Sequence, residues 1–181
     1  MSRLGKLPIK LSEGVSARIE NSFVIVKGPK GELRQEVPSL IKVVIVDNEI
    51  QVSLNSFTSK KERAFWGLFR SLIGNLVIGV TEGFEKKLEV SGIGYKAAIS
   101  GKKLTLNIGY SHPIIFDLPE GINGAVEGNI ITISGIDKQL VGEISAQIRK
   151  IKKSDPYKGK GIKYCGEIIR RKEGKRASKS E

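Results

Sequence analysis

The sequence repeats part of itself, and this duplication constrains the fold more than any other feature. Residues 11–28 align without a gap on residues 118–135, which lie in the second half of the 181-residue chain. Each copy reads as a Glu-Gly pair, a β-like run, a tight turn at residues 20–22 or 127–129, and a second β-like run, so each predicts a β-hairpin. A repeat spacing near half the chain length indicates two copies of one small domain rather than a solenoid.

Each copy also ends in one predicted helix. In the first copy, Ser59 and Glu62 have the spacing of a capping box. Apolar residues follow at helical spacing, namely Phe65, Leu68, Phe69, Leu72, Ile73 and Leu76. In the second copy, Asp137 is the expected N-cap. The apolar face of that helix comprises Leu140, Val141, Ile144, Ile148 and Ile151. Its last turn carries Arg149, Lys150, Lys152 and Lys153, which suits the negative end of the helix dipole.

Short β-like runs fill the space between these landmarks. They cover residues 42–46, 50–54, 87–91, 96–100 and 104–108, with turns at residues 47–48, 101–103 and 109–113. The pattern predicts an α+β fold of two similar small domains, each a mainly antiparallel sheet packed with one helix, followed by a basic C-terminal tail. We place the first domain at residues 1–81, the second at residues 82–153 and the tail at residues 154–181, where the periodicity ends.

The charge of the chain is large and unevenly distributed. The chain has 31 Lys and Arg against 19 Asp and Glu, a net charge of +12. Residues 149–181 contain 13 basic and 4 acidic residues, a net of +9, whereas the preceding 148 residues contribute only +3. A basic excess of this kind predicts a polyanionic partner, either nucleic acid or an acidic membrane surface.

Few side chains in the sequence could support catalysis or hold a metal. His112 is the only histidine and Cys165 the only cysteine, so His-based metal clusters, an internal disulfide and a Cys-x-x-Cys pair are excluded. We interpret Cys165 as a buried or merely tolerated thiol. The Gly-Ile-Gly at residues 92–94 lacks the third glycine of a dinucleotide fingerprint, because Ala97 stands there, and it precedes a β-like run. The sequence therefore predicts no enzyme, no metal, no cofactor and no small-molecule substrate.

A membrane role is the main alternative for the basic tail. The longest apolar run, residues 72–80, contains Gly74 and Asn75 and falls short of the roughly 20 residues that span a bilayer. The first residues lack the apolar core of a signal peptide. A peripheral membrane protein would need bulky apolar residues beside the basic ones, and the tail offers only three isoleucines. Together with the single cysteine, these features predict a soluble cytoplasmic protein.

Residues 155–166 interleave lysines, glycines and tyrosines in a way that favours RNA binding. Lysines at 158, 160 and 163 can neutralise phosphates and release counterions. Glycines at 159, 161 and 166 allow the backbone to approach a sugar-phosphate surface, and tyrosines at 157 and 164 can stack on exposed bases. A solvated tail is the alternative interpretation. It is less well supported for residues 157–172 and at least as good for residues 173–181.

Five segments make the chain resemble a known family. They are Gly-Leu-Phe-Arg-Ser-Leu-Ile at residues 67–73, Val-Thr-Glu-Gly-Phe-Glu-Lys-Lys-Leu at 80–88, Gly-Ile-Gly-Tyr-Lys-Ala at 92–97, Gly-Tyr-Ser-His-Pro at 109–113, and Asp-Pro-Tyr-Lys-Gly-Lys-Gly-Ile-Lys-Tyr at 155–164. In this order they resemble the large-subunit ribosomal protein six family in its bacterial form, over nearly the whole chain. The unusual Trp66 is expected to fill the core of the first domain.

The resemblance implies a structural protein of the large ribosomal subunit that supports subunit assembly and translation. It implies binding to large-subunit (23S-type) rRNA near the sarcin-ricin loop and the base of the factor-binding stalk, beside neighbouring ribosomal proteins and close to where translational GTPases dock. The RNA contacts that it implies in the tail are Tyr157, Lys158, Gly159, Lys160, Gly161, Lys163, Tyr164, Arg170, Arg171 and Lys172. Those in the loops of the second domain are Tyr95, Lys96, Ser111 and His112.

Overall fold

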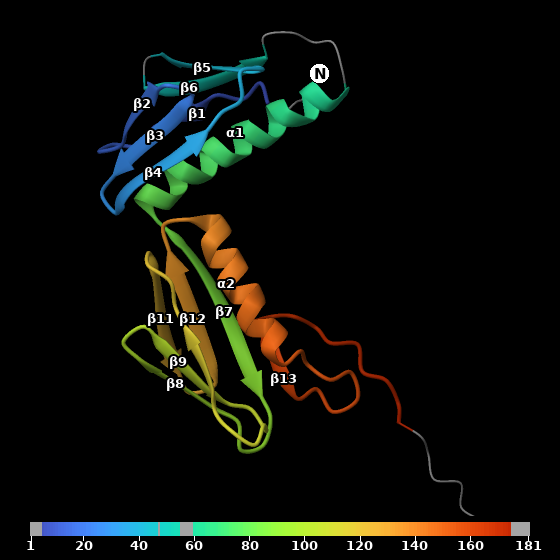
Figure 1. The fold of residues 1–181 in the computed structure, drawn as a ribbon. Coiled ribbons are helices and arrows are strands. Elements are labelled where there is room, and N and C mark those ends of the chain that lie inside the picture. Colours follow the sequence, from blue (N-terminus) through green and yellow to red (C-terminus); the bar gives the residue numbers. More distant parts are fainter. Residues whose placement is uncertain (1–4, 47, 55–59, 175–181) are drawn as a thin grey trace, which may run out of the picture. The chain divides into compact units, whose positions relative to one another are not determined.

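The computed structural model describes residues 5–46, 48–54 and 60–174, without the side chains of residues 60 and 61. The chain divides into two compact units (Figure 1). Unit 1 comprises Met1–Phe84 with Gly135–Lys138, and unit 2 comprises Glu85–Ser134 with Gln139–Glu181. Each unit combines one α-helix with small antiparallel sheets. The predicted α+β fold class is therefore confirmed.

Unit 1 contains two three-stranded sheets and the helix α1 (Lys60–Thr81). One sheet has the order β1-β6-β5 and consists of β1 (Ile9–Lys10), β6 (Glu49–Leu54) and β5 (Ile41–Val46). The other has the order β2-β3-β4 and consists of β2 (Ser16–Glu20), β3 (Phe23–Gly28) and β4 (Gly31–Glu36). The helix contacts strands of both sheets, and one apolar core joins the three elements. Val26 in β3, Ile50 in β6 and Ile73 in α1 are fully buried in that core.

The first hairpin of the duplicated sequence forms as predicted. β2 and β3 pair antiparallel with Glu20 opposite Phe23, so that Asn21 and Ser22 form the turn. Both turn residues have positive φ, 43° and 72°, as the tight turns that match the twist of a hairpin require. The predicted turn at residues 47–48 falls partly outside the described residues, which include Asn48 but not Asp47. The capping residue Ser59 also lies outside them.

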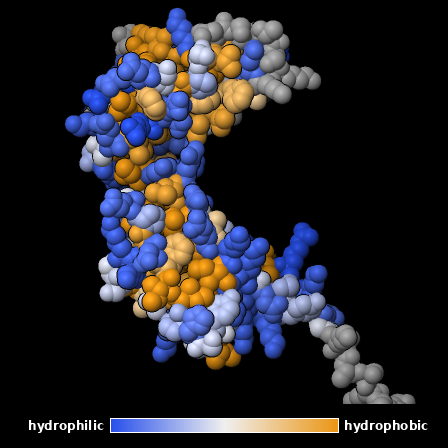
Figure 2. Space-filling view, viewed as in Figure 1, coloured by the Kyte–Doolittle hydropathy of each residue, from blue (hydrophilic) through white to orange (hydrophobic). Residues whose placement is uncertain are grey.

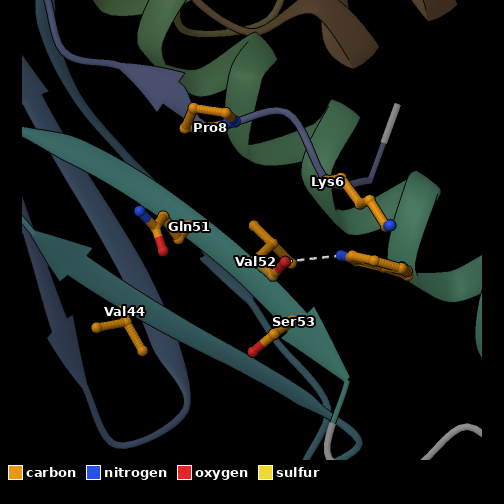
Figure 3. Close-up of a pocket in the computed structure, with 7 residues that line it drawn as sticks. Lys6, Pro8, Val44, Gln51, Val52 and Ser53 are labelled. Atoms are coloured by element: carbon orange, nitrogen blue, oxygen red, sulfur yellow. Dashed lines mark hydrogen bonds between the residues drawn. The ribbon is translucent and has the colours of Figure 1, made fainter. Parts of the chain in front are cut away.

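The buried face of α1 overlaps the predicted one but does not coincide with it. Of the six predicted apolar residues, Phe69 and Ile73 are buried, and Leu72 and Leu76 pack against the core. Phe65 and Leu68 are exposed, at 41% and 48% of their surface. The buried stripe consists of Trp66, Phe69, Ile73, Val77 and Val80. Trp66 fills the core as predicted, and its indole Nε1 donates a hydrogen bond of 2.7 Å to the Val52 carbonyl oxygen (Figure 3). Apolar residues cover a side of this helix that is wider than the buried stripe, so periodicity alone could not select which part of it packs.

The length of α1 also exceeds the apolar run recognised in the sequence. Gly74 and Asn75 lie within the helix and do not end it. Glu62–Thr81 is consequently long and apolar enough to cross a membrane, by length and composition only. The buried stripe of α1 packs against both sheets of unit 1, which accounts for its apolar residues without a membrane.

Unit 2 contains a four-stranded sheet, a three-stranded sheet and the helix α2 (Lys138–Ile151). The four-stranded sheet has the order β11-β12-β7-β13 and consists of β11 (Ile122–Glu127), β12 (Ile130–Gly135), β7 (Phe84–Ser91) and β13 (Gly161–Tyr164). The three-stranded sheet has the order β10-β9-β8 and consists of β10 (Ile114–Asp117), β9 (Lys103–Asn107) and β8 (Lys96–Ser100). α2 begins directly after Asp137, the predicted N-cap, and buries Val141, Ile144 and Ile148.

The strand β13 is the main element that the sequence did not indicate; β1, β4 and β10 are the others. β13 pairs antiparallel with β7, from Gly161 opposite Ser91 to Tyr164 opposite Leu88. Ile162 is fully buried, and its backbone N–H donates a 2.8 Å hydrogen bond to the carbonyl oxygen of Lys152. Four residues with one fully buried side chain give too short a pattern for recognition. Part of the basic tail is therefore an edge strand of unit 2.

Two glycines of this segment are required by the fold itself. Gly161 is buried with φ +141°, and a Cβ atom there would lie 2.6 Å from the Lys153 carbonyl oxygen. Gly159 is also buried, with φ +70°. A side chain at position 161 would displace the chain that enters β13. Close packing against the backbone therefore accounts for Gly161, and the positive φ accounts for Gly159.

Replacing Ile162 with alanine should destabilise the protein by about 2–4 kcal/mol, because the change leaves a cavity under β13. Ile168→Ala is the matched control, since Ile168 is 92% exposed and its truncation should change stability by less than about 0.5 kcal/mol. Urea unfolding followed by far-ultraviolet circular dichroism measures both variants. Equal stability of the two variants would contradict the assignment of β13 to the core of unit 2.

Candidate nucleic-acid interface

Three loops meet at one end of unit 2. β7 ends at Ser91, opposite Gly161, where β13 begins. β8 begins at Lys96, opposite Asn107, where β9 ends. These pairings bring the loops at residues 92–95, 108–113 and 155–160 to the same end of the two sheets, and we call them together the loop end (Figure 1). Segments that are more than 40 residues apart in the sequence thus form one surface.

Tyr95 holds the first two loops together. Its backbone N–H donates a 3.2 Å hydrogen bond to the Gly92 carbonyl oxygen, which closes a tight turn. Its ring packs against the backbone of Gly92 and Gly109 so closely that a Cβ atom at either would lie 2.6 Å or 3.1 Å from a ring carbon. Ser111 and His112 follow in the second loop, are exposed, and lie 3.3 Å apart from Oγ to Nδ1.

The third loop is organised by Asp155. Its carboxylate accepts backbone hydrogen bonds from Tyr157 at 3.2 Å and Lys158 at 3.0 Å, and these bonds lower the pKa of Asp155. The backbone N–H of Asp155 donates to the Lys160 carbonyl oxygen at 2.9 Å, which closes the loop at its base. The loop therefore presents Tyr157, which is 55% exposed, and Lys158 on an ordered backbone.

The chain after β13 turns back along this loop. We call residues 165–174 the return segment. The backbone N–H of Lys172 donates a 3.0 Å hydrogen bond to the Pro156 carbonyl oxygen, and the Arg171 guanidinium lies beside Gly159. Arg170, Arg171 and Lys172 are all exposed. The return segment thereby adds its cations to those of the loop end.

Glu167 fixes the start of the return segment. Its carboxylate accepts hydrogen bonds from Nε and an NH2 group of Arg149, the former at 3.1 Å, and from the backbone N–H of Tyr164 at 3.0 Å. The Arg149 guanidinium also lies over the Tyr164 ring, 5.4 Å from its centre. The Arg149 guanidinium, followed by the Tyr164 N–H, lowers the pKa of Glu167, and Glu167 in turn raises the pKa of Arg149. This node ties the return segment to α2 and β13.

The predicted site residues divide into exposed and engaged groups. Those exposed at the loop end or on the return segment are Lys96, Ser111, His112, Tyr157, Lys158, Arg170, Arg171 and Lys172. Tyr95 and Lys160 are half-buried, and Gly159 and Gly161 are buried. Lys163 forms a 3.0 Å ion pair with Glu89, and Tyr164 packs under Arg149. The structure thus brings all of these residues into unit 2 but leaves only some of them accessible.

Sequence reasoning missed three residues that shape this surface: Lys152, Tyr110 and Arg149. Lys152 and Arg149 were interpreted only as cations at the end of a helix. Tyr110 lies beside Ser111 and His112 in the same Gly-Tyr-Ser-His-Pro segment, which was the signal available for it. Their roles depend on contacts between distant parts of the chain, so local patterns could not show them.

The surface formed by residues 155–172 is basic. It contains six Lys and Arg residues and two acidic ones, Asp155 and Glu167, and both acids accept hydrogen bonds from the protein. Figure 2 shows hydrophilic side chains gathered over α2 and the chain that follows it. A concentration of cations with the exposed ring of Tyr157 suits the phosphates and exposed bases of RNA.

Other described parts of the molecule are weaker candidates for a binding or catalytic site. An open pocket of unit 1 is lined by Lys6, Pro8, Val44, Gln51, Ser53 and the ring of Trp66, and the indole N–H of Trp66 is already bonded to Val52 (Figure 3). Among the residues that the structure describes, no group of three His, Cys, Asp or Glu side chains could hold a metal ion. Cys165 is exposed, because it follows the last residue of β13 at the sheet edge. Of the two alternatives expected for this thiol, buried or merely tolerated, the buried one is therefore wrong.

Replacing Glu167 with glutamine should loosen the return segment at neutral pH, by up to about 1 kcal/mol for a partly solvated ion pair. Because the folded-state pKa of Glu167 is lowered, its contribution is present at neutral pH and is lost as the pH falls below about 4.3, the ordinary value. Amide hydrogen exchange at Tyr164 should therefore rise in the variant and lose its acid-dependent step. Glu120→Gln, at a side chain that is 98% exposed, should leave that step intact. A step that persists in Glu167→Gln would contradict this assignment.

Comparison with known proteins identifies the family of the chain. The family model for ribosomal protein L6 matches residues 11–83 and 91–165. The chain is 51% identical over 177 residues to the large ribosomal subunit protein uL6 of Beijerinckia indica, covering 97% of this chain and 99% of that protein. It is 51% identical over 180 residues to the uL6 protein of Methylacidiphilum infernorum, covering 99% and 100%. The protein uL6c of Guillardia theta is 50% identical over 180 residues, covering 99% and 100%. With both repeats matched and near full-length identity of about half, the chain belongs to the ribosomal protein L6 family.

Proposed function

We propose that this protein is a structural, non-catalytic constituent of the large ribosomal subunit in the cytoplasm, and that it binds large-subunit rRNA through unit 2. The relatives named as large ribosomal subunit proteins support this proposal. The observation that carries the RNA-binding part is the convergence of three loops and the return segment into one basic surface with exposed tyrosine. In functional terms, residues 82–153 form the RNA-binding domain, and residues 154–181 supply its basic extension.

The candidate residues differ in the kind of RNA contact that their exposure and existing partners allow. Lys158, Arg170, Arg171 and Lys172 are exposed cations and are the best-placed phosphate ligands. Tyr157 is exposed on the ordered loop and can stack on an unpaired base. In the protein without RNA, Lys163 is already ion-paired with Glu89. Binding of the Lys163 ammonium group to a phosphate would therefore replace one anionic partner with another. Ser111 and His112 can donate to phosphate or ribose oxygens from the second loop.

The location that we propose is near the sarcin-ricin loop and the base of the factor-binding stalk. There the protein would contact neighbouring ribosomal proteins and lie close to the docking site of translational GTPases. A basic surface held rigid by internal hydrogen bonds could neutralise phosphate repulsion between adjacent RNA helices and fix their spacing during assembly.

Replacing Arg170 and Lys172 together with glutamine should weaken binding to a large-subunit rRNA fragment. It should also lower the slope of log affinity against log salt concentration by up to about 1.8, because two phosphate neutralisations are lost. Substitution is preferable to truncation before β13, which would remove buried Ile162 from the core. Filter binding or fluorescence anisotropy over a salt series gives both quantities.

The matched control removes the same charge from the other end of the β8–β9 hairpin. Lys102 and Lys103 are exposed beside the turn that joins these two strands, and their double replacement with glutamine should leave the salt slope nearly unchanged. Equal losses in the two double variants would mean that only net charge matters, and would overturn the assignment of the interface to the return segment.

Chemical probing of large-subunit rRNA with and without the protein tests the proposed location. Protections should cluster at the sarcin-ricin loop and the stalk base, and should fade there in the Arg170→Gln, Lys172→Gln variant. Protections confined to a different region of the rRNA would refute this location while leaving RNA binding itself intact.

A further inference from the structure

The ammonium group of Lys152 lies where the segments of the loop end meet. Its Nζ donates a 2.8 Å hydrogen bond to the Ile108 carbonyl oxygen, at the start of the second loop. The same Nζ lies 5.3 Å from the centre of the Tyr95 ring and 4.6 Å from the centre of the Tyr110 ring. One cation therefore contacts both the loop at residues 92–95 and the loop at residues 108–113, and its partner Ile108 lies 44 residues away in the chain.

The backbone around Lys152 joins the remaining segments. Its carbonyl oxygen accepts the N–H of Ile162 at 2.8 Å, which fixes the entry into β13. The carbonyl oxygen of the preceding residue, Ile151, accepts the Tyr110 hydroxyl at 2.9 Å. The end of α2 thus holds the second loop by two polar contacts and β13 by a third. Lys152 is half-buried, whereas Lys150, two residues earlier in the chain, is exposed.

We infer that Lys152 is a positioning residue, which orders the two tyrosine-bearing loops for RNA and does not itself contact a phosphate. This inference rests on the proposed rRNA-binding function. A cation between two aromatic rings and a carbonyl oxygen has its favourable contacts inside the protein, so its transfer to a phosphate would release both loops. Loops that are already ordered bind with less loss of conformational entropy.

A phosphate ligand and a positioning residue give different salt dependence. Removing a phosphate contact lowers the salt slope by up to about 0.9. Removing a positioning residue weakens binding at every salt concentration and leaves the slope unchanged. A residue with a role only in global stability would lower the unfolding midpoint without altering the affinity of the folded protein.

The test uses the full-length chain with Lys152 replaced by methionine, which keeps an unbranched side chain and removes the charge. Affinity for the rRNA fragment should fall about fivefold to tenfold, the cost of ordering two loops on binding, with the salt slope unchanged. Lys152→Arg keeps the cation and a donor, and should recover most of the affinity. Lys150→Met removes the same charge from an exposed position in the last turn of α2, two residues before Lys152, and should not reproduce the loss.

Amide hydrogen exchange in the absence of RNA provides a readout that does not depend on the proposed function. In Lys152→Met, exchange should rise at residues 92–95 and 108–112, while β7 and β12 keep their protection. Failure of the unaltered chain to bind rRNA would count against the proposed function and would leave this readout to decide the inference. Unchanged loop exchange, or a salt slope reduced by about 0.9 in Lys152→Met, would overturn the positioning role.

Discussion

The pairing of β13 with β7 is the contact on which the candidate interface depends. It buries Ile162 completely and places Gly161 opposite Ser91 at the loop end. The loop at residues 155–160 must consequently close between the end of α2 and the start of β13, and the return segment must leave from the opposite end of that short strand. Without this edge strand, the basic residues that follow α2 would have no fixed position relative to the loops at residues 92–95 and 108–113.

The cations of unit 2 serve two different purposes. Arg149, Lys152 and Lys163 are engaged inside the protein, with Glu167, the Ile108 carbonyl oxygen and Glu89. Lys158, Arg170 and Lys172 are exposed on segments that these engaged residues hold. A count of positive charge treats both groups alike, although only the second presents its charge to a partner. Ordering part of the charge within the protein lowers the entropy lost when the rest meets RNA.

The tyrosines divide in the same way. Tyr95 and Tyr110 flank Lys152, and Tyr164 lies under Arg149, so these three rings have contacts within unit 2, although Tyr110 also keeps 48% of its surface exposed. Tyr157 lies on a loop whose backbone is fixed by Asp155, with its ring exposed. Stacking on a base is thus best supported for Tyr157, whereas Tyr95 and Tyr164 act mainly through the shape that they give to neighbouring segments.

The sequence by itself determined the duplication, the Asn21-Ser22 hairpin turn, the burial of Trp66 and the basic character of the last segment. These features depend on residues that are close together in the chain, where turn geometry, side-chain size and charge can be read directly. The tertiary structure alone decided that Gly161–Tyr164 is a strand, that Phe65 and Leu68 face outward on α1, and that Lys152 joins two loops. A four-residue strand has too few positions for a period. The apolar side of α1 is wider than the stripe that packs, so packing had to select the buried face. The contacts of Lys152 and Tyr110 span 44 and 41 residues, a separation at which only the folded chain brings the partners together.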